Sequence, residues 1–566
     1  MSSAGPSRLL RPRDVTIAAI LYAVVTIAIT WPLFQHPATS VLETRSLYGK
    51  SGVLVQRDIN LTMWILAWDV HALATDPTRL FHANAFYPAP WSLALSEHML
   101  GNLPLFGPVY LATGNPVLAH QTTLFATFIL SGLAMAAWAF SWTRDRAVAL
   151  VAGLAFAIAP ARLWQMGNLH IVSTQYYPIV LLVIDALVDR RARWGGAVLL
   201  GIALALAVGC SYYVGYAAFL IAAVYAGTRV LGARAWHAVA PLATAALLAV
   251  AVTAPLSLPY LWLQRSGVLP RYGDPGQQTS LALLAMLKFG AGGMLEWFVM
   301  PRRDGIPQFL TWTACGLAIV ALARHSPAPR GALFAVLVAG VVLSLGPFAL
   351  LPVLPGRVIP LPYRLLQIVV PGFSAMRAPQ RMGILATVAI VALAALGLAW
   401  LCARLRARGR TRLATLLPVV VAAALVLEAR PGALAARRIF VGPTVPRAYQ
   451  WLAAHGDGGA LLELPIFPVD LHRESAYMYY STFHWLPLLN GYSSYPPASW
   501  RALADAALKL PAPEALDAVL ANGPRWVLFH RDAIAPDDRA AWESLLGTQL
   551  RRVEDFGDAV LYERKA

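Results

Sequence analysis

The fold of this chain is decided by the stretch VTIAAILYAVVTIAITWPLF at positions 15–34. It contains no charged residue, and a membrane-spanning helix needs about 20 residues of this kind. Arg8, Arg11 and Arg13 precede it. Because basic residues stay on the cytoplasmic side, we expect an uncleaved first span that begins inside the cell.

Further apolar runs define the fold class. They lie at 117–140, 147–159, 174–187, 197–209, 212–228, 238–262, 309–323, 332–351, 382–401 and 413–427. With 58% hydrophobic and 13% charged residues, the sequence predicts a polytopic α-helical membrane protein of about eleven spans. Residues 103–113 are also apolar, but a span there would turn the Arg-rich loops outward. We therefore expect them to form a helix that lies on the membrane surface or dips into it.

The net charge of +17 is best explained by membrane orientation. Basic residues gather at 144–146, 190–193, 229–234, 324–330 and 404–412, between the apolar runs. By the positive-inside rule these loops face the cytoplasm, so the C-terminus lies outside. The charge therefore does not indicate nucleic-acid binding. The Ala- and Arg-rich composition is typical of a bacterial protein, and we expect a multi-pass protein of the inner membrane with its N-terminus inside.

The three cysteines carry no sign of a special site. Cys210, Cys315 and Cys402 lie in or beside apolar runs, without the spacing of metal ligands. We expect neither a disulfide framework nor a zinc site, and interpret them as small apolar residues.

The composition divides the chain near residue 430. Residues 1–430 hold the apolar runs and a long first outward loop at 35–115, whereas residues 431–566 have the composition of a soluble domain. There, strand-like runs lie at 460–464, 526–530 and 559–562, and helical patterns lie at 446–454, 513–521 and 536–546. The sequence predicts an extracytoplasmic α/β domain that can bury a core of its own.

The first outward loop concentrates carboxylates in a chain that uses acids sparingly. They are Asp58, Asp69, Asp76 and Glu97. Helical spacing over 60–73 puts Trp64 and Trp68 one turn apart, which favours an amphipathic helix at the membrane interface. Asp58 precedes that helix and has two interpretations. It activates a hydroxyl as a deprotonated carboxylate, or it caps the N-terminus of the helix.

These features resemble the GT-C superfamily of membrane glycosyltransferases. Its members share a first span, a large outward loop with an essential Asp near its start, and a similar number of spans. More narrowly, the chain is similar to uncharacterised bacterial members with an outward C-terminal domain. The resemblance covers the whole chain in architecture, with loose sequence motifs. It implies that Asp58 acts as general base, or orients the acceptor hydroxyl, towards the anomeric carbon of a polyprenyl-phosphate sugar.

Glu97, in Ser96-Glu97-His98, is the second candidate carboxylate. It is a partner of Asp58, a ligand of sugar hydroxyls or of a cation, or a solvated surface side chain. His98 beside it is a candidate substrate contact. No spacing singles out a metal site, although two carboxylates could hold Mg²⁺ or Mn²⁺. The resemblance ties such a metal to pyrophosphate-linked donors.

A lipid phosphate needs cations at the outer interface, and Arg suits this role because its planar group binds two oxygens at once. Arg377 and Arg381 lie in FSAMRAPQR, on the outward side where the charge rule disfavours them. They hold the donor phosphate, or they extend to ordinary lipid headgroups. Tyr363, shortly upstream, is a further candidate contact.

A second basic pair, Arg302 and Arg303, lies in another outward segment. Glu296 and Trp297 precede it on a possible interfacial helix. Surface ion pairing with Asp304 explains this pair as readily as phosphate binding does.

Other outward residues carry weaker signals. His170, in a short outward loop, is a substrate contact or a structural histidine. In the tail, residues 477–485, with His484 and Trp485, and residues 490–492 combine aromatic rings with hydroxyl and amide groups. Such a surface can stack on sugars. It can equally dock the tail onto the membrane domain, and both interpretations stay open.

The sequence thus predicts an inverting glycosyltransferase that moves a sugar from a polyprenyl-phosphate donor to an extracytoplasmic acceptor in the cell envelope. Its partners would be membrane lipids, that donor, and a glycan or lipid acceptor, with no nucleic acid. An alternative is a transporter or flippase of a lipid-linked precursor, which would carry ionisable residues in mid-span. The spans contain few, notably Asp185 and Glu428 near span ends. A third possibility is a non-catalytic assembly scaffold of the same fold.

Overall fold

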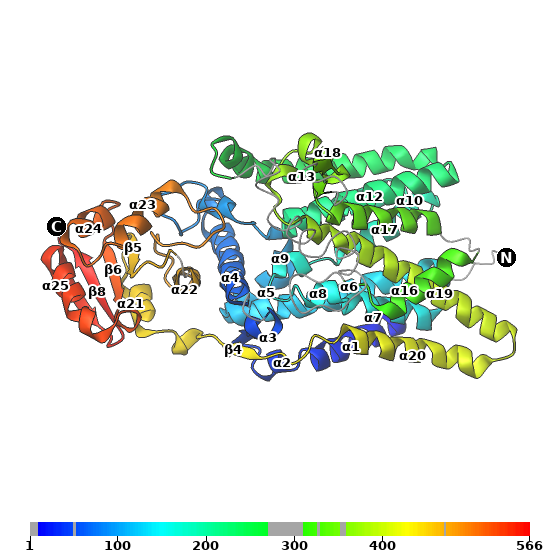
Figure 1. Ribbon diagram of the computed structural model, residues 1–566, viewed down its shortest axis with the longest axis horizontal. Helices are drawn as coiled ribbons and strands as arrows, with labels where there is room; N and C mark the ends of the chain where they lie inside the picture. Colours follow the sequence, from blue (N-terminus) through cyan, green and yellow to red (C-terminus); the bar gives the residue numbers. More distant parts are fainter. Residues whose placement is uncertain are drawn as a thin grey trace.

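The computed structural model describes residues 10–48, 52–269, 309–324, 329–350, 358–468 and 471–565. A bundle of apolar helices forms its larger part (Figure 1). These helices are α1 (Pro12–Ile29), α6 (Pro116–Thr143), α7 (Arg146–Ala157), α8 (Pro160–Leu163), α9 (Leu169–Val172), α10 (Tyr176–Val188), α11 (Trp194–Cys210), α12 (Tyr212–Ala233), α13 (Val239–Arg265), α16 (Trp312–Ala323), α17 (Arg330–Ser344), α19 (Ile384–Ala407) and α20 (Thr411–Ala429).

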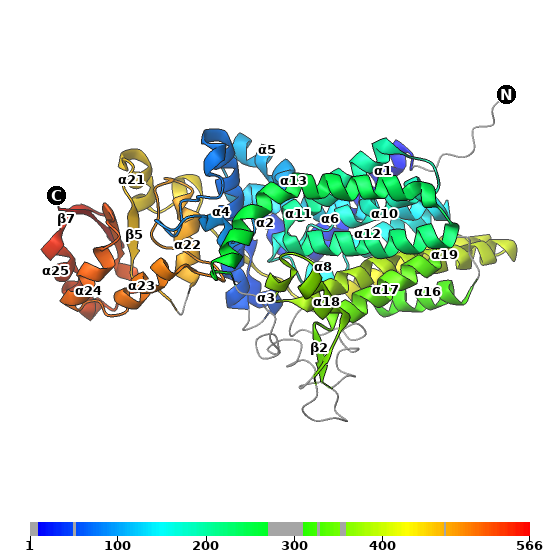
Figure 2. The same cartoon turned by 90° about the horizontal axis from the view of Figure 1, so that it is seen from above.

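Every apolar run predicted from the sequence overlaps one of these helices. Within the described ranges, 8 helical stretches are long and apolar enough to cross a membrane, and α11, α16 and α17 are shorter apolar helices. The total of about eleven spans stays a prediction. In the run at 332–351, α17 ends at Ser344 and a hairpin of β2 (Phe348–Leu350) and β3 (Val358–Pro360) follows. This hairpin and α18 (Pro362–Val369) lie on the flank of the bundle (Figure 2).

The two ends of the bundle differ in character. The N-terminus and the Arg-rich turn between α19 and α20 lie at one end, and the C-terminal region covers the other (Figure 1). At the first end, Arg406 donates to Asp145 at 2.7 Å and Arg146 pairs with Asp14 at 3.2 Å. Surface pairs of this kind add little stability in water. Their value here is that they locate the basic end of the molecule.

The first outward loop crosses the opposite end. It contains α2 (Pro32–Gln35), β1 (Ser40–Leu42), α3 (Thr44–Tyr48), α4 (Gly52–Thr75) and α5 (Leu103–Thr113). The helix α4 runs transverse to the bundle (Figure 1). The predicted surface helix at 103–113 is α5, which is not among the described helices long and apolar enough to span.

Two expectations about α4 are wrong. The helix begins at Gly52 rather than near residue 60, so Asp58 lies inside it and cannot cap its N-terminus. Trp64 and Trp68 are not at a lipid interface, because they are only 1% and 7% exposed within the protein. The Trp64 indole donates to Asn84 Oδ1 at 3.0 Å. The helix α4 does have the apolar face that the sequence predicted, but this face packs against other parts of the chain instead of lipid.

The C-terminal region forms a four-stranded mixed sheet with helices around it. Its strands are β5 (Leu461–Leu464), β6 (Trp526–His530), β7 (Leu550–Asp555) and β8 (Ala559–Arg564), in the order β5-β6-β8-β7. Its helices are α21 (Arg447–His455), α22 (His472–Ser481), α23 (Ala498–Ala507), α24 (Pro513–Leu520) and α25 (Arg539–Gln549). The pair β5–β6 is parallel and the other pairs are antiparallel. The three predicted strands and three predicted helices are confirmed, while β7, α22 and α23 were not predicted.

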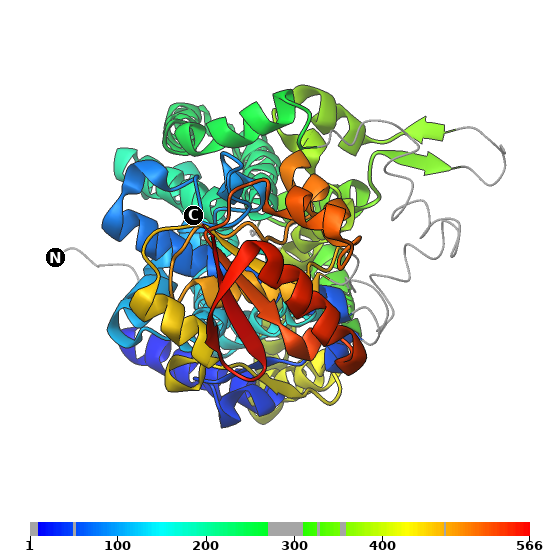
Figure 3. The ribbon, with the colours of Figure 1, turned by 90° about the vertical axis from the view of Figure 1, so that its left-hand side faces the viewer.

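This region lies over the end of the helix bundle (Figure 3) and packs onto the first outward loop. One hydrophobic core runs from α4 into the sheet without a break. At the contact, Phe86 N donates to Asn490 O at 3.0 Å, and Leu488 N donates to Asn84 O at 2.6 Å. A second link is β1, which pairs antiparallel with β4 (Ala436–Arg438). The loop and the tail therefore fold as one unit above the bundle.

The close approach at this contact yields a prediction. A Cβ on Gly491 would lie 2.5 Å from Phe86 Cε1, and Phe86 is itself wedged against Trp500 with 6.2 Å between ring centroids. We expect Gly491→Ala to lower the free energy of unfolding by about 1–3 kcal/mol, as overpacking does. The measurement is the thermal unfolding midpoint in detergent.

The matched control is Gly547→Ala in α25, where a Cβ meets nothing within 4 Å. This change should leave the midpoint unchanged or raise it slightly, because Ala favours helix over Gly by about 1 kcal/mol. Equal midpoints for the two variants would show that the loop and the tail do not depend on this contact.

Candidate functional site

A cavity of about 440 Å³ lies where α4, the first outward loop, α12, α13, the segment before α19 and the C-terminal region meet. The polar residues that line it include Asp58, Thr62, Ser96, Glu97, Asn168, His170, Tyr212, Tyr213, Tyr216, Thr253, Ser257, Tyr260, Gln264, Arg377, Arg381, Ser494 and Tyr495. The cavity therefore gathers residues from outward segments that are distant in the sequence.

Asp58 reaches the cavity from α4. Its Oδ1 accepts a hydrogen bond of 2.9 Å from the hydroxyl of Tyr492 in the C-terminal region. Burial raises the pKa of Asp58, while the Tyr492 hydrogen bond and the positive charges of Arg381, Arg377 and Arg57 lower it. Because burial has the largest effect, the carboxylate ionises at a higher pH than an ordinary Asp does. A carboxylate held in this way is a competent proton acceptor.

Glu97 lines the same cavity but has a different setting. Its Oε1 accepts from the Ser211 hydroxyl at 2.9 Å, and its Oε2 accepts from Tyr212 N at 3.0 Å. Ser211 is the N-cap of α12, so Glu97 lies against a helix N-terminus, which favours negative charge. Burial raises the pKa of Glu97, and these hydrogen bonds and Arg381 lower it. Both carboxylate oxygens are thus engaged in fixing α12.

Arg377 and Arg381 also line the cavity, as their sequence position suggested. Tyr213 fixes their segment: its hydroxyl accepts from Arg377 N at 3.0 Å, and its ring lies 4.6 Å from the Arg381 guanidinium carbon. Within the described part of the chain, the buried Nε of Arg381 has no hydrogen-bond partner. An N–H donor left in this state favours an anionic ligand.

The remaining candidates divide into two groups. His170 lines the cavity, next to Asn168. The candidates that do not line it are His98, Tyr363, His484 and Trp485. Their suggested substrate contacts remain predictions.

Each of these four side chains has a structural setting outside the cavity. Burial lowers the pKa of His98 to about 4, and its Nδ1 accepts from Leu100 N at 3.3 Å. Tyr363 is buried behind the segment that carries Arg377. Burial lowers the pKa of His484 to about 3. Trp485 stacks on His71 of α4 with 4.1 Å between ring centroids.

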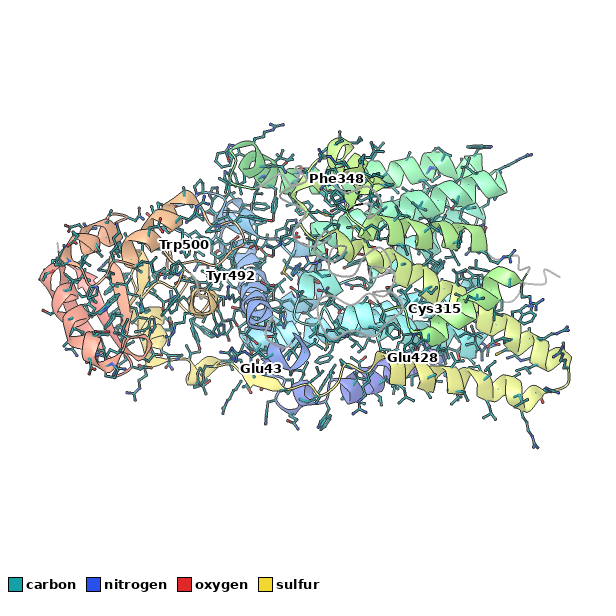
Figure 4. All side chains as sticks on the ribbon, viewed as in Figure 1. Glu43, Cys315, Phe348, Glu428, Tyr492 and Trp500 are labelled. Carbon is teal, nitrogen blue, oxygen red and sulfur yellow. The ribbon has the colours of Figure 1, made fainter. Side chains whose placement is uncertain are left out.

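The stacking of Trp485 on α4 favours the docking interpretation of the tail aromatics. The same tail contains Tyr492, which lies where the tail meets α4 (Figure 4). Its hydroxyl donates to Asp58. Sequence reasoning named Tyr492 but could not connect it with Asp58, because the two lie 434 positions apart.

An apolar wall completes the cavity, and sequence reasoning did not foresee it. It is formed by α13, whose Val250 and Leu258 both line the cavity and are 53% and 62% exposed. A side chain that borders a cavity and the outer surface of an apolar helix marks an opening towards the surrounding lipid. Tyr212, Tyr213 and Tyr216 of α12 line the same cavity, and the Tyr212 hydroxyl lies 3.0 Å from Ser257 Oγ of α13.

The arrangement does not suit a divalent metal. Glu97 already accepts two hydrogen bonds, and two guanidinium groups share the cavity. In the described ranges there is no group of three or more His, Cys, Asp and Glu residues that could hold a metal ion. Hard cations such as Mg²⁺ need several oxygen ligands. We therefore derive no step through Mg²⁺ or Mn²⁺.

The setting of Glu97 gives a prediction about stability. Glu97→Ala leaves Tyr212 N and the Ser211 hydroxyl without their acceptor, which costs about 1–3 kcal/mol for a buried donor. Glu97→Gln keeps one oxygen and should cost less. The measurement is the thermal unfolding midpoint of the two variants beside Glu554→Ala, an exposed acid of β7. If the unfolding midpoint of Glu97→Ala matched that of the wild type, Glu97 would not anchor the start of α12.

Comparison with known proteins supports this architecture. No model of a protein family matches the chain, and no curated protein does. A solved structure of the arabinofuranosyltransferase AftD from Mycobacteria aligns with a TM-score of 0.57 and 15% identity, covering 99% of this chain and 40% of that one. A mutant of AftD aligns with a TM-score of 0.51 and 16% identity, covering 99% and 42%.

The chain therefore spans about two fifths of the length of AftD. At this level of identity the likeness concerns the fold. The chain shares its fold with the part of AftD that it covers, which agrees with the GT-C resemblance expected from the sequence.

Proposed function

We propose that this protein is a membrane glycosyltransferase of the cell envelope. It takes a sugar from a polyprenyl-phosphate donor and transfers it to an extracytoplasmic glycan or lipid acceptor, with inversion at the anomeric carbon. The observation that carries the proposal is the composition of one cavity. A carboxylate, two guanidinium groups and an apolar wall open to lipid meet there. The GT-C-like fold supports the same activity.

The reaction assigns a role to each of these groups. Asp58 takes the proton from the acceptor hydroxyl as its oxygen attacks the anomeric carbon. The bond from that carbon to the phosphate oxygen breaks, and the electron pair leaves with the phosphate. Attack and departure occur on opposite faces of the sugar, which inverts the anomeric configuration. Arg377 and Arg381 stabilise the negative charge that develops on the leaving phosphate.

The lipid nature of the donor is supported by the wall formed by α13. A polyprenyl chain is apolar throughout, so it gains free energy by lying on apolar surface instead of in water. Val250 and Leu258 offer such a surface between the cavity and the bilayer. The phosphate would then lie at the polar end of the cavity, where Arg381 keeps an unsatisfied N–H donor among the described residues.

The proposed location is the bacterial inner membrane with the cavity on the outer side. The start of α1 and the Arg-rich turn lie at one end of the bundle (Figure 2). If the positive-inside rule places that end in the cytoplasm, the cavity and the C-terminal region are extracytoplasmic. The boundary between the two parts near residue 430 follows the end of α20 at Ala429.

A transporter or flippase is less well supported. Such a protein would expose ionisable groups along a passage through the bilayer. Asp185 is buried and bonded to Trp138, Tyr225 and Arg229, and it does not line the cavity. Glu428 accepts from Thr313 at the start of α16. Both acids thus have local structural partners. A non-catalytic scaffold would keep the fold without transferring sugar, and the assay below distinguishes it.

The proposal predicts that Asp58→Asn abolishes sugar transfer. Protein in lipid nanodiscs is incubated with labelled polyprenyl-phosphate sugars and envelope lipids, and transfer of label is measured. We expect a fall of at least about 100-fold, because general-base catalysis contributes about 10²–10⁴-fold. The matched control is Asp76→Asn in the same loop. Its side chain caps a turn by accepting from Thr78 N at 3.1 Å, and Asn can replace it there.

Wild-type transfer that disappears in Asp58→Asn and persists in Asp76→Asn would support the assignment. Equal transfer by Asp58→Asn and wild type would rule out Asp58 as the base. Absence of transfer from all donors, together with lipid scrambling, would favour the flippase.

A further inference from the structure

The C-terminal region contributes directly to the wall of the cavity. Ser494 and Tyr495 line it, and the hydroxyl of Tyr492 donates to Asp58 Oδ1 at 2.9 Å. Beside them, the Ser493 hydroxyl donates to Leu95 O at 2.6 Å. Four successive residues of the tail thus line the cavity or form hydrogen bonds to residues beside it.

The tail segment is itself held by a buried hydrogen-bond network. Asn490 is the centre of this network: its Oδ1 accepts from Glu463 N at 2.7 Å and its Nδ2 donates to Glu463 O at 3.0 Å. The buried carboxylate of Glu474 accepts from Asn490 Nδ2 at 3.2 Å and from Gly491 N at 3.4 Å. Asn490 therefore ties the turn before Tyr492 to β5 and α22.

Such a network fixes the position of Tyr492 more tightly than a surface loop could. A fully satisfied buried polar network has one preferred arrangement, because any shift leaves a donor or acceptor without a partner. Tyr492 leaves this network at Gly491, where a larger residue would collide with Phe86. The Tyr492 hydroxyl is thus preset at its contact with Asp58.

We propose that Tyr492 is a positioning residue for Asp58, so that the C-terminal region completes the active site instead of only recruiting the acceptor. This inference rests on the proposed function for the catalytic consequence, but the Tyr492–Asp58 contact can be tested without it. Tyr492 fixes Oδ1 and stabilises the charged carboxylate, and Oδ2 receives the proton of the acceptor hydroxyl.

Several charged and titratable groups surround Asp58 and must be considered with Tyr492. They are Arg57 on α4, Arg377 and Arg381 before α19, Glu97 in the first loop and His170 between α8 and α10. The three Arg residues favour the ionised carboxylate, and Glu97 opposes it when it is charged. Tyr492 differs from all of them, because it is the neutral donor in direct contact with Asp58.

The sign of the expected effect follows from the hydrogen bond. Tyr492 donates to the charged form of Asp58 and so lowers its pKa, against the rise caused by burial. Tyr492→Phe removes only the hydroxyl. The pKa of Asp58 should then rise by about one pH unit, since hydrogen bonds to charged groups are of this strength. A base that must be deprotonated then loses activity at the acid side of the profile.

The test combines a titration with a pH profile. Infrared spectra of wild type and Tyr492→Phe are recorded over a pH series, and the carboxyl band of Asp58 is assigned by its loss in Asp58→Asn. We expect the midpoint in Tyr492→Phe to lie about one unit higher, with about a tenfold fall in kcat/KM below it. At high pH, where Asp58 is ionised in both proteins, only the loss of positioning remains, so the rate should fall less there. The matched control is Tyr480→Phe, which changes a Tyr of α22 that does not line the cavity.

A second variant keeps the test decisive if Tyr492→Phe is poorly folded. Fluorinated tyrosine at position 492 keeps the side chain and makes its hydroxyl a stronger donor, so the Asp58 midpoint should fall. Unchanged midpoints in both variants would overturn the inference, even if the protein transfers sugar. A shifted midpoint in a protein that transfers no sugar would keep the Tyr492–Asp58 contact and reject the proposed function.

Discussion

Asp58 lies in a cavity that favours its neutral form, and the structure around it supplies groups that favour its charged form. Burial raises its pKa, whereas Tyr492, Arg381 and Arg377 lower it. These opposing groups come from the C-terminal region and from the segment that enters α19, so their position requires that bundle, loop and tail be assembled first. The continuous core between α4 and the sheet meets this requirement. The setting of this carboxylate thus depends on long-range packing.

The bilayer explains why the chemistry gathers at one end of the molecule. Ionisable groups are costly in the hydrocarbon core, and in the described spans Asp185 is engaged by three neighbouring donors. A lipid-linked substrate has an apolar chain and a charged phosphate, so its binding site needs an apolar surface next to charged groups. These two kinds of surface meet only at the membrane boundary. The apolar wall of α13 and the two Arg residues meet in that zone. The C-terminal region borders the same cavity through Ser494 and Tyr495.

The sequence predicted the apolar helices and three of the four tail strands, and it assigned Asp58, Glu97, Arg377, Arg381 and His170 to outward segments, which the structure brings together in one cavity. Hydropathy, the periodicity of apolar residues and the distribution of charge can be read from short stretches of sequence, and these features depend on them. The predictions from the sequence were wrong or incomplete where segments distant in the sequence determine the surroundings of a side chain. The Trp64 pattern fits lipid or protein equally well, and the Glu97 contact with the start of α12 requires a packing partner. Arg302, Arg303, Glu296 and Trp297 lie outside the described residues.

The most direct test of the account is to locate a polyprenyl phosphate on the protein by electron cryomicroscopy in lipid nanodiscs. The proposed binding mode places the phosphate within hydrogen-bond distance of Arg377 and Arg381, with Asp58 facing it and the polyprenyl chain along α13. A phosphate bound away from Asp58, or a chain that avoids the α13 wall, would contradict it.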